Sequence, residues 1–319
     1  MNDPVFDTAD RLFGNAVDKA LLDAAEAGTF PADLWRSVED TGLTQALDES
    51  GDFATAASVL RAAGRHAVPL PIAETLLARH LLARAGQDLP DGPLSLAFLD
   101  GAAARDVAWA RRATTIVALV GDQVALIDPA AADIRPGRNL AGEPRDILAS
   151  APATTIAAAP IDAEALRRLG AWSRAVLMQG AMEKALEIAT GYANDRVQFG
   201  RPIGKQQAIQ HQLALMAEEV AAAGVAAQLA TQHIDGPDAF LAIAAAKIRC
   251  GEAAGKAAEY AHQTLGAIGF THEHTLHHLT RRLWSWRDEY GRESEWSMAL
   301  GRHVGTIGGE RLWHWLTQA

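Results

Sequence analysis

The spacing of apolar and polar residues divides the chain into a helical first part, a short strand-rich part and a longer helical last part. In the first part, apolar residues recur every three or four positions, as on the buried face of a helix. Pro31 and Gly42 mark the start and end of one short helix, and similar patterns cover 52–65 and 72–85. We therefore predict an N-terminal helical domain over residues 1–92.

The pattern changes to short, β-branched runs after this domain. The runs SLAFLD, TTIVALV, DQVALIDP and ATTIAAAP are separated by Gly, Asp and Pro, which is typical of strands joined by turns. Gly121 and Asp122 stand alone between two of these runs and predict a tight hairpin. We predict a small β module over residues 93–160.

Long helical patterns then occupy the rest of the chain. Asp162 is a suitable N-cap for the first of them. The patterns cover about 162–194, 204–233, 237–264, 272–287 and 293–316. Short connections between long helices predict an antiparallel bundle, here the C-terminal helical bundle of residues 161–319. The predicted fold class is α+β and mostly α.

Composition limits the class of partner. The chain has 319 residues and a net charge of −10, which argues against binding to nucleic acid. Its single cysteine, Cys250, permits no internal disulfide and no cysteine-based zinc site. The start of the chain resembles no signal peptide, and no run of 18 apolar residues predicts a membrane span. We therefore expect a cytoplasmic protein without a membrane or nucleic-acid partner.

One stretch, Arg196–Gln210, combines residue types that suit a phosphate-bearing planar cofactor. Its sequence RVQFGRPIGKQQAIQ supplies a guanidinium, amides, an aromatic ring and two glycines at a helix–turn–helix junction. A guanidinium pairs with phosphate through two parallel hydrogen bonds, and glycine lets a backbone approach closely. The alternative for Arg196 is a bond to the last carbonyls of the preceding helix.

This stretch, together with Tyr192, resembles the acyl-CoA dehydrogenase family, whose C-terminal domain carries Y-x-x-x-R-x-Q-F-G-x-x-[IL]. A second string, QTLGAIGFTHE from Gln263 to Glu273, is similar to the family's Q-x-x-G-G-x-G-Y-x-x-E, with Ala267 replacing one glycine. The order of helices, β module and helices is also that of the family. The resemblance implies that both strings contact FAD across a subunit interface. The implied cofactor-binding residues are Arg196, Gln198, Phe199, Gly200, Gln263, Gly266 and Gly269; for Gly266 and Gly269 a helix cap and turn is the alternative.

Two features of the family are missing. Nothing between residues 93 and 160 matches its E-P-x-x-G-S-D-like string, which holds the flavin ring and the acyl-CoA. The catalytic base of the family is a glutamate, and the two positions where the resemblance places it are Tyr290 and Gly170. Glu289 is the substitute beside the first position, and it stays a candidate base with a solvated acidic residue as the alternative. Bulky residues crowd the same region and suggest core or interface packing, a filled acyl pocket, or a pocket shaped for a rigid polycyclic acyl group: Trp284, Trp286, Tyr290 and Trp296.

The histidines raise the question of a metal. His274 and His278 are four residues apart on a predicted helix, a spacing that can ligate zinc. The string is not HExxH, and no cysteine or carboxylate set accompanies it. We therefore predict no metal site.

The resemblance implies an FAD-dependent enzyme that desaturates the Cα–Cβ bond of an acyl-CoA substrate. The favoured interpretation is the short, base-lacking subunit type of the heteromeric steroid-side-chain acyl-CoA dehydrogenases. Such a chain supplies FAD contacts to a longer catalytic chain in a heterotetramer. One alternative is a self-sufficient homodimer or larger homo-oligomer with Glu289 as base, and the other is a non-catalytic structural or regulatory homologue. The implied electron acceptor is electron-transferring flavoprotein.

Overall fold

The computed structural model describes residues 3–48 and 51–318. Five short helices form the first part, and aspartate side chains cap the first turns of three of them, at Asp3, Asp18 and Asp52. Helix α5 is buried almost all round, including its charged residues Glu74 and Arg79, which form ion pairs with Arg174 and Asp48. The helices are α1 (Pro4–Ala16), α2 (Lys19–Glu26), α3 (Ala32–Asp40), α4 (Phe53–Arg65) and α5 (Ile72–Arg84).

The strand-rich part contains two sheets. The first has the order β1-β3-β4-β7, in which β1 and β3 are parallel; the second has the order β2-β6-β5. The predicted hairpin is confirmed, because β3 and β4 are joined by Gly121 and Asp122, with Gly121 at a φ of 62°. The strands are β1 (Leu94–Phe98), β2 (Ala104–Ala108), β3 (Thr115–Val120), β4 (Gln123–Ile127), β5 (Asp133–Arg135), β6 (Arg145–Ser150) and β7 (Ala153–Ala158). The sequence patterns located β1, β3, β4 and β7 but missed β2, β5 and β6.

The last part is a bundle of long helices, as predicted. The side chain of Asp162 caps α6 by accepting a hydrogen bond of 2.6 Å from the backbone N–H of Ala165. The helix predicted over 293–316 is broken at Gly308, whose φ of 82° no continuous helix can adopt. The helices are α6 (Ala163–Asp195), α7 (Gln207–Gln232), α8 (Ala239–Leu265), α9 (Leu276–Asp288), α10 (Glu293–Ile307) and α11 (Gly309–Gln318).

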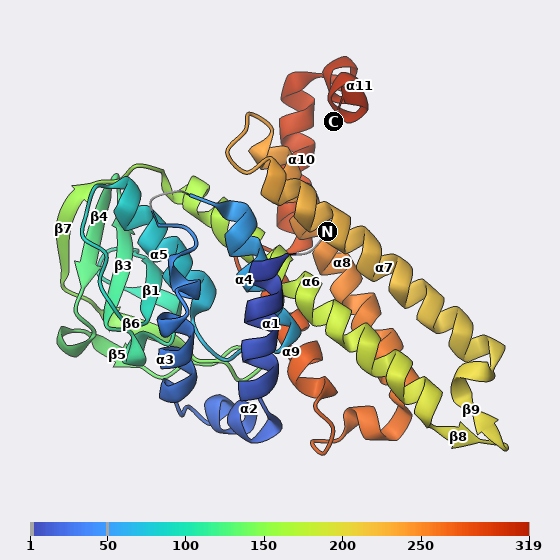
Figure 1. Ribbon diagram of the computed structural model, residues 1–319. Coiled ribbons are helices and arrows are strands. Elements are labelled where there is room, and N and C mark those ends of the chain that lie inside the picture. Colours follow the sequence, from blue (N-terminus) through green and yellow to red (C-terminus); the bar gives the residue numbers. More distant parts are fainter. Residues whose placement is uncertain (1–2, 49–50, 319) are drawn as a thin grey trace.

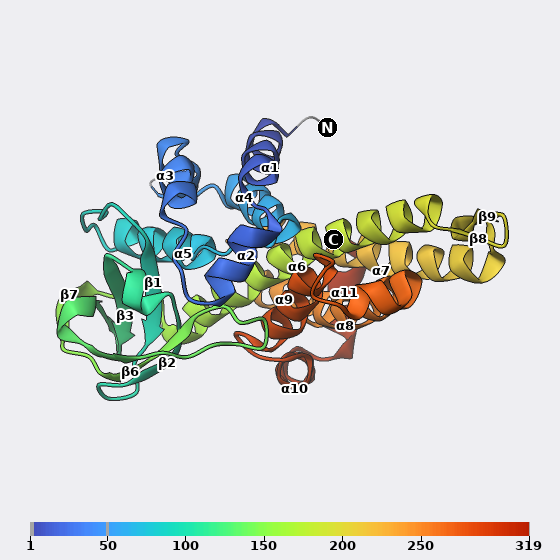
Figure 2. The same ribbon diagram turned by 90° about the horizontal axis from the view of Figure 1, so that it is seen from below.

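The turn predicted between α6 and α7 is a small β-hairpin. Strands β8 (Val197–Gln198) and β9 (Arg201–Pro202) pair antiparallel, with Phe199 and Gly200 at the tip. Figures 1 and 2 show that this hairpin lies at one end of the bundle and that the two larger sheets lie at the other. Helix α6 runs between these ends, so it connects two distant regions of the molecule (Figure 1).

One large core joins the N-terminal helices, the inner face of the first sheet and the bundle, while a smaller apolar cluster lies between the two sheets. Within the described residues, α7 is the one helix long and apolar enough to cross a membrane by length and composition, with 28% of the tested window buried. It packs against α6 and α8, and bundle helices often meet this criterion. Its outer face exposes Val225 and Leu229.

Candidate functional site

The two strings that resemble FAD-contacting motifs meet at one cavity. This cavity, here called the hairpin-end cavity, has a volume of about 650 Å³ and lies where α6 ends and α8 ends. Its lining includes four of the seven predicted contact residues, namely Arg196, Gln198, Gln263 and Gly266. The fold therefore brings together residues that are far apart in the sequence.

The charge of the hairpin-end cavity is unusual for an acidic protein. No aspartate or glutamate lines it, although acidic residues outnumber basic ones in the chain. Arg196 is its one charged lining residue, and the guanidinium makes no hydrogen bond or ion pair within the described part of the chain. The amides of Gln198, Gln206 and Gln263 add donors. Such a lining suits an anion, above all a phosphate.

The three remaining predicted residues do not line the hairpin-end cavity. Phe199 and Gly200 form the hairpin tip, both with positive φ, at 52° and 77°. An aromatic residue in this region is uncommon, and its side chain is 94% exposed, so the tip projects outward. Gly269 is buried, and a Cβ there would lie 3.0 Å from Cβ of Leu265. The position of Gly269 is therefore explained by packing.

Gly266 combines a structural and a cavity-lining role. It ends α8 with a φ of 63° and a ψ of −140°, a conformation that residues with a side chain rarely adopt. A Cβ at this position would meet nothing within 4 Å. The glycine is therefore needed for its backbone angles, and those angles turn the chain along the cavity wall.

A second and larger cavity lies at the other end of α6, between the sheets and the bundle. This junction cavity has a volume of about 830 Å³. Its apolar wall includes Leu96, Phe98, Trp284 and Tyr290. Its charged lining consists of four arginines and five acidic residues: Arg105, Arg145, Arg167, Arg174, Asp106, Glu164, Asp288, Glu289 and Glu295.

Glu289 lies in the wall of the junction cavity, where two arginines bind its carboxylate. Arg145 donates from Nε and Nη2 at 2.9 and 3.2 Å, and Arg174 donates from Nε at 2.6 Å. Asn139 adds a further hydrogen bond of 3.1 Å. Burial alone would raise the pKa of Glu289, but the two guanidinium charges and these bonds lower it to about 2. Its role as a base stays a prediction, and its ion pairs favour an anchoring role because a general base needs a pKa nearer neutrality.

The two positions where the resemblance places a catalytic glutamate touch each other. A Cβ atom at Gly170 would lie 2.3 Å from Cδ1 and Cε1 of Tyr290, so the ring occupies the space of any side chain at position 170. The same ring lies over the guanidinium of Arg174 at 5.1 Å and meets Phe98 edge-on. Neither position carries a carboxylate, and the tyrosine closes the space between them.

The loop that carries Glu289 and Tyr290 is fixed by bonds to its backbone. The buried Lys247 donates to the carbonyls of Arg287 and Gly291 at 2.6 and 2.8 Å, and burial lowers its pKa to about 8. Trp296 donates to the carbonyl of Tyr290 at 3.1 Å, as does Arg167. These four bonds fix the backbone of the loop.

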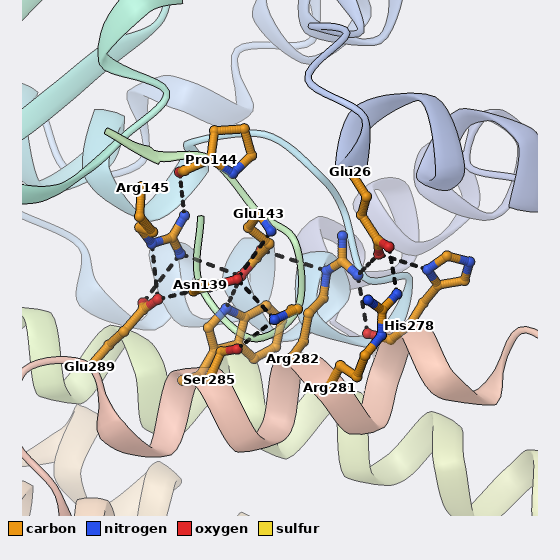
Figure 3. Close-up of polar contacts among 12 residues, drawn as sticks. Glu26, Asn139, Glu143, Pro144, Arg145, His278, Arg281, Arg282, Ser285 and Glu289 are labelled. Atoms are coloured by element: carbon orange, nitrogen blue, oxygen red, sulfur yellow. Dashed lines mark hydrogen bonds and ion pairs between the residues drawn. The ribbon is translucent and has the colours of Figure 1, made fainter. Parts of the chain in front are cut away.

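A buried polar network links the sheets to the bundle along α9 (Figure 3). The loop before β6 bonds α9 through Glu143, which accepts from Nε1 of Trp286 at 3.0 Å. At the other end of the network, Glu26 accepts from His278 at 2.7 Å and from Arg282 at 2.9 Å. Burial raises the pKa of Glu26, and these partners reverse the effect and lower it to about 2.

Sequence reasoning missed most of this network. Arg174 and Lys247 interrupt long apolar runs, which is a signal that a charge is buried with partners. The histidines that raised the question of a metal are engaged elsewhere, because Nδ1 of His274 accepts from the backbone of Leu276 at 3.0 Å. Within residues 3–48 and 51–318, no three potential ligands gather around a point.

Comparisons with known proteins identify the bundle. Residues 165–287 match the family described as acyl-CoA dehydrogenase, C-terminal domain. Acyl-CoA dehydrogenase IpdE2 of Mycolicibacterium smegmatis is 29% identical over 229 residues, which are 71% of each chain. Acyl-CoA dehydrogenase FadE34 of Mycobacterium tuberculosis is 36% identical over 141 residues, which are 43% of this chain. The match spans only 19% of FadE34.

Solved structures share the fold over nearly the whole chain. A variant of the Tcur3481-Tcur3483 steroid ACAD superposes with a TM-score of 0.82 at 22% identity, covering 95% of this chain and 97% of the other. The ChsE4-ChsE5 complex from Mycobacterium tuberculosis gives a TM-score of 0.80 at 18% identity, with coverages of 96% and 98%. These likenesses confirm the predicted fold class. Residues 165–287 therefore match the acyl-CoA dehydrogenase C-terminal domain, and the chain shares its fold with these solved structures.

Proposed function

We propose that this chain is a subunit of an FAD-dependent acyl-CoA dehydrogenase that contacts, through the hairpin-end cavity, a flavin held mainly by a partner chain. The observation that carries the proposal is the lining of that cavity, with a free guanidinium, three glutamine amides and no acidic residue. This lining fits the diphosphate of FAD. When bound, the flavin ring supplies hydride acceptance in the desaturation of an acyl-CoA thioester.

The distance between the two cavities supports contact with another chain's flavin. Arg174 lines the junction cavity and Arg196 lines the hairpin-end cavity, and 22 residues of α6 separate them. At the rise of an α-helix this spacing is about 33 Å. One FAD molecule does not span this distance. A flavin ring bound beside β1 and a diphosphate bound at Arg196 would therefore belong to two different FAD molecules.

The surface around the hairpin-end cavity supports a subunit interface. Val197, Phe199, Ile268 and Phe270 are large apolar residues exposed near its two motifs. Exposed apolar groups around a polar site are typical of protein interfaces. The structural neighbours include two complexes named for two chains, ChsE4-ChsE5 and Tcur3481-Tcur3483, which favours a longer, different chain over a second copy.

The self-sufficient homo-oligomer is the alternative, with Glu289 as base. Its low pKa and its two arginine partners weigh against it. In either case, Arg196 would hold the diphosphate, and Gln198 and Gln263 would orient it through their amides. We also propose a cytoplasmic location and electron-transferring flavoprotein as the electron acceptor.

The flavin content of the purified protein tests the proposal. We expect the chain alone to be nearly colourless, and to gain flavin when it is co-expressed with a longer acyl-CoA dehydrogenase chain from the same genome. In the complex, Arg196→Ala should weaken FAD binding about 10- to 100-fold, because it removes a charge-assisted hydrogen-bond pair. Arg201→Ala is the matched control, since Arg201 lies in the same hairpin outside the cavity lining.

Two results would contradict the proposal. One flavin per chain in the protein purified alone would favour the homo-oligomer, and loss of turnover in Glu289→Gln with the fold retained would then assign the base. Equal flavin retention in Arg196→Ala and Arg201→Ala would overturn the cofactor contact itself.

A further inference from the structure

One wall of the hairpin-end cavity is a short turn directly after α8, Gly266–Phe270, here called the cavity-wall turn. Its first three residues line the cavity. Its backbone hydrogen bonds within the described residues are local: the N–H of Gly266 donates to the carbonyl of His262, and that of Thr271 donates to the carbonyl of Ile268. Local bonds give a turn its shape, but side-chain packing must fix its place against the rest of the protein.

One buried imidazole supplies that packing. His262 lies in the last turn of α8, is 6% exposed and stands outside the cavity lining. Its ring stacks on the ring of Phe270, with the centroids 4.5 Å apart and the planes inclined by 24°. A Cβ atom at Gly269 would lie 3.4 Å from Nδ1 of His262, so the backbone of the turn lies close against the imidazole. The ring therefore contacts the cavity-wall turn at two neighbouring positions.

The imidazole is itself held by α9. Its Nε2 shares a hydrogen bond of 2.9 Å with Oγ1 of the buried Thr280, and the ring of Trp284 lies nearly parallel to it at 6.2 Å between centroids. Aromatic rings at such distances attract each other beyond the area that they bury. Burial lowers the pKa of His262 from its ordinary value, so the ring is uncharged at neutral pH. Residues outside the hairpin-end cavity thus set the orientation of the ring.

We propose that His262 is a positioning residue for the hairpin-end cavity, and that its ring holds the cavity-wall turn in the place where a dinucleotide binds. His262 directly precedes the cavity-lining Gln263, so the residue that supports the wall stands beside the residues that form it. A wall that is ordered in advance binds more tightly, because its ordering does not oppose binding. The inference rests on the proposed function, and it adds to that function a residue outside the cavity lining.

Hydrogen exchange of the full chain tests the positioning role without any flavin. His262→Ala should raise the exchange rates of the amides at 267–271 about three- to tenfold, because the turn loses the ring on which it packs. His262→Phe keeps a ring that can stack on Phe270, and it should keep these rates within about twofold of the native values. His80→Ala is the matched control, since His80 is also buried against an aromatic ring but lies on α5, outside the cavity lining.

Flavin affinity tests the consequence for binding. The complex with the longer chain is stripped of FAD and titrated with it. His262→Ala should weaken FAD binding about three- to tenfold, whereas His262→Phe and His80→Ala should bind FAD within about twofold of the native complex. Gly269→Ala presses a methyl group against the imidazole and should weaken binding in the same direction, which keeps the test valid if His262→Ala does not fold.

Native FAD affinity in His262→Ala would overturn the positioning role, whether or not the turn exchanges faster. The role is equally refuted if His262→Phe binds FAD as weakly as His262→Ala, because packing of the ring would then not be what holds the turn. Arg196→Ala separates this inference from the flavin contact itself. If Arg196→Ala weakens FAD binding and His262→Ala does not, the role of His262 alone is refuted; if neither variant weakens it, the flavin contact fails as well.

Discussion

Replacing Gly170 by alanine tests the contact between the two positions where relatives of this chain are expected to carry a base. A Cβ at position 170 would lie 2.3 Å from the ring of Tyr290, far inside van der Waals contact. The ring cannot easily withdraw, because Trp296 holds the backbone of Tyr290 and Arg174 lies under its face. We expect Gly170→Ala to destabilise the protein, although alanine is the better helix former.

The magnitude follows from two opposing terms. An extra methyl group in a well-packed core costs about 1–3 kcal/mol, and replacing glycine by alanine inside a helix gains about 1 kcal/mol. The net loss in the free energy of unfolding is therefore up to about 2 kcal/mol. In a Tyr290→Ala background the ring is absent, and Gly170→Ala should stabilise by about 0.5–1 kcal/mol. The coupling energy of the two substitutions is then the packing cost itself, about 1–3 kcal/mol.

Urea unfolding of the four proteins at one protein concentration, followed by circular dichroism, measures this coupling. Gly191→Ala is the matched control, because Gly191 lies on the same helix and a Cβ there meets nothing within 4 Å. The control should stabilise both backgrounds equally. If Gly170→Ala changes the free energy of unfolding by the same amount with and without the ring, the argument for a filled base position is refuted.

Two further variants test the buried charges. Glu289→Gln leaves Arg145 and Arg174 short of a buried anion and should cost about 3–5 kcal/mol of stability at neutral pH. The pKa of Glu289 is about 2 in the folded chain against 4.5 ordinarily, so its contribution to stability is complete above pH 4.5. The difference in the free energy of unfolding between the native protein and Glu289→Gln should therefore shrink as the pH falls from 4.5 to 2. A constant difference would count against the ion pairs. For Lys247, the folded pKa of about 8 against 10.5 ordinarily means that the unfolded chain binds more protons between these values. The stability of the native protein relative to Lys247→Met should therefore rise from pH 8 to 10.5, and a flat difference would show that the lysine is not desolvated.

The elements that the sequence predicted well are those with a strong local period. The long helices, the N-cap at Asp162 and the hairpin turn at Gly121 depend on residues within a few positions of each other. Strand β2 was missed because ARDVA places Arg105 and Asp106 where a strand normally carries apolar or β-branched residues. Strand β5 has three residues, too few for a period to be visible.

The same difference between local and long-range signals explains which of the two sites could be predicted from the sequence. The hairpin-end cavity could be anticipated because two continuous strings carry its lining, including Arg196 and Gln263. The junction network could not, because Glu74, Arg145 and Arg174 come from three separate parts of the chain. A charged residue in an apolar run shows that a partner is needed, but only the fold shows which acid supplies it.

The junction network also bears on where the base of the proposed enzyme lies. A general base works best with a pKa near neutrality, and a carboxylate with a pKa of about 2 falls short of that by about 7 kcal/mol of proton affinity. Restoring it would require moving Arg145 and Arg174 away, yet Glu143 and Glu74 also bind these arginines. The charges that hold the sheets against the bundle thus weaken Glu289 as a base, so structural anchoring and proton transfer compete for one carboxylate. This competition favours a division of labour in which another chain provides the base.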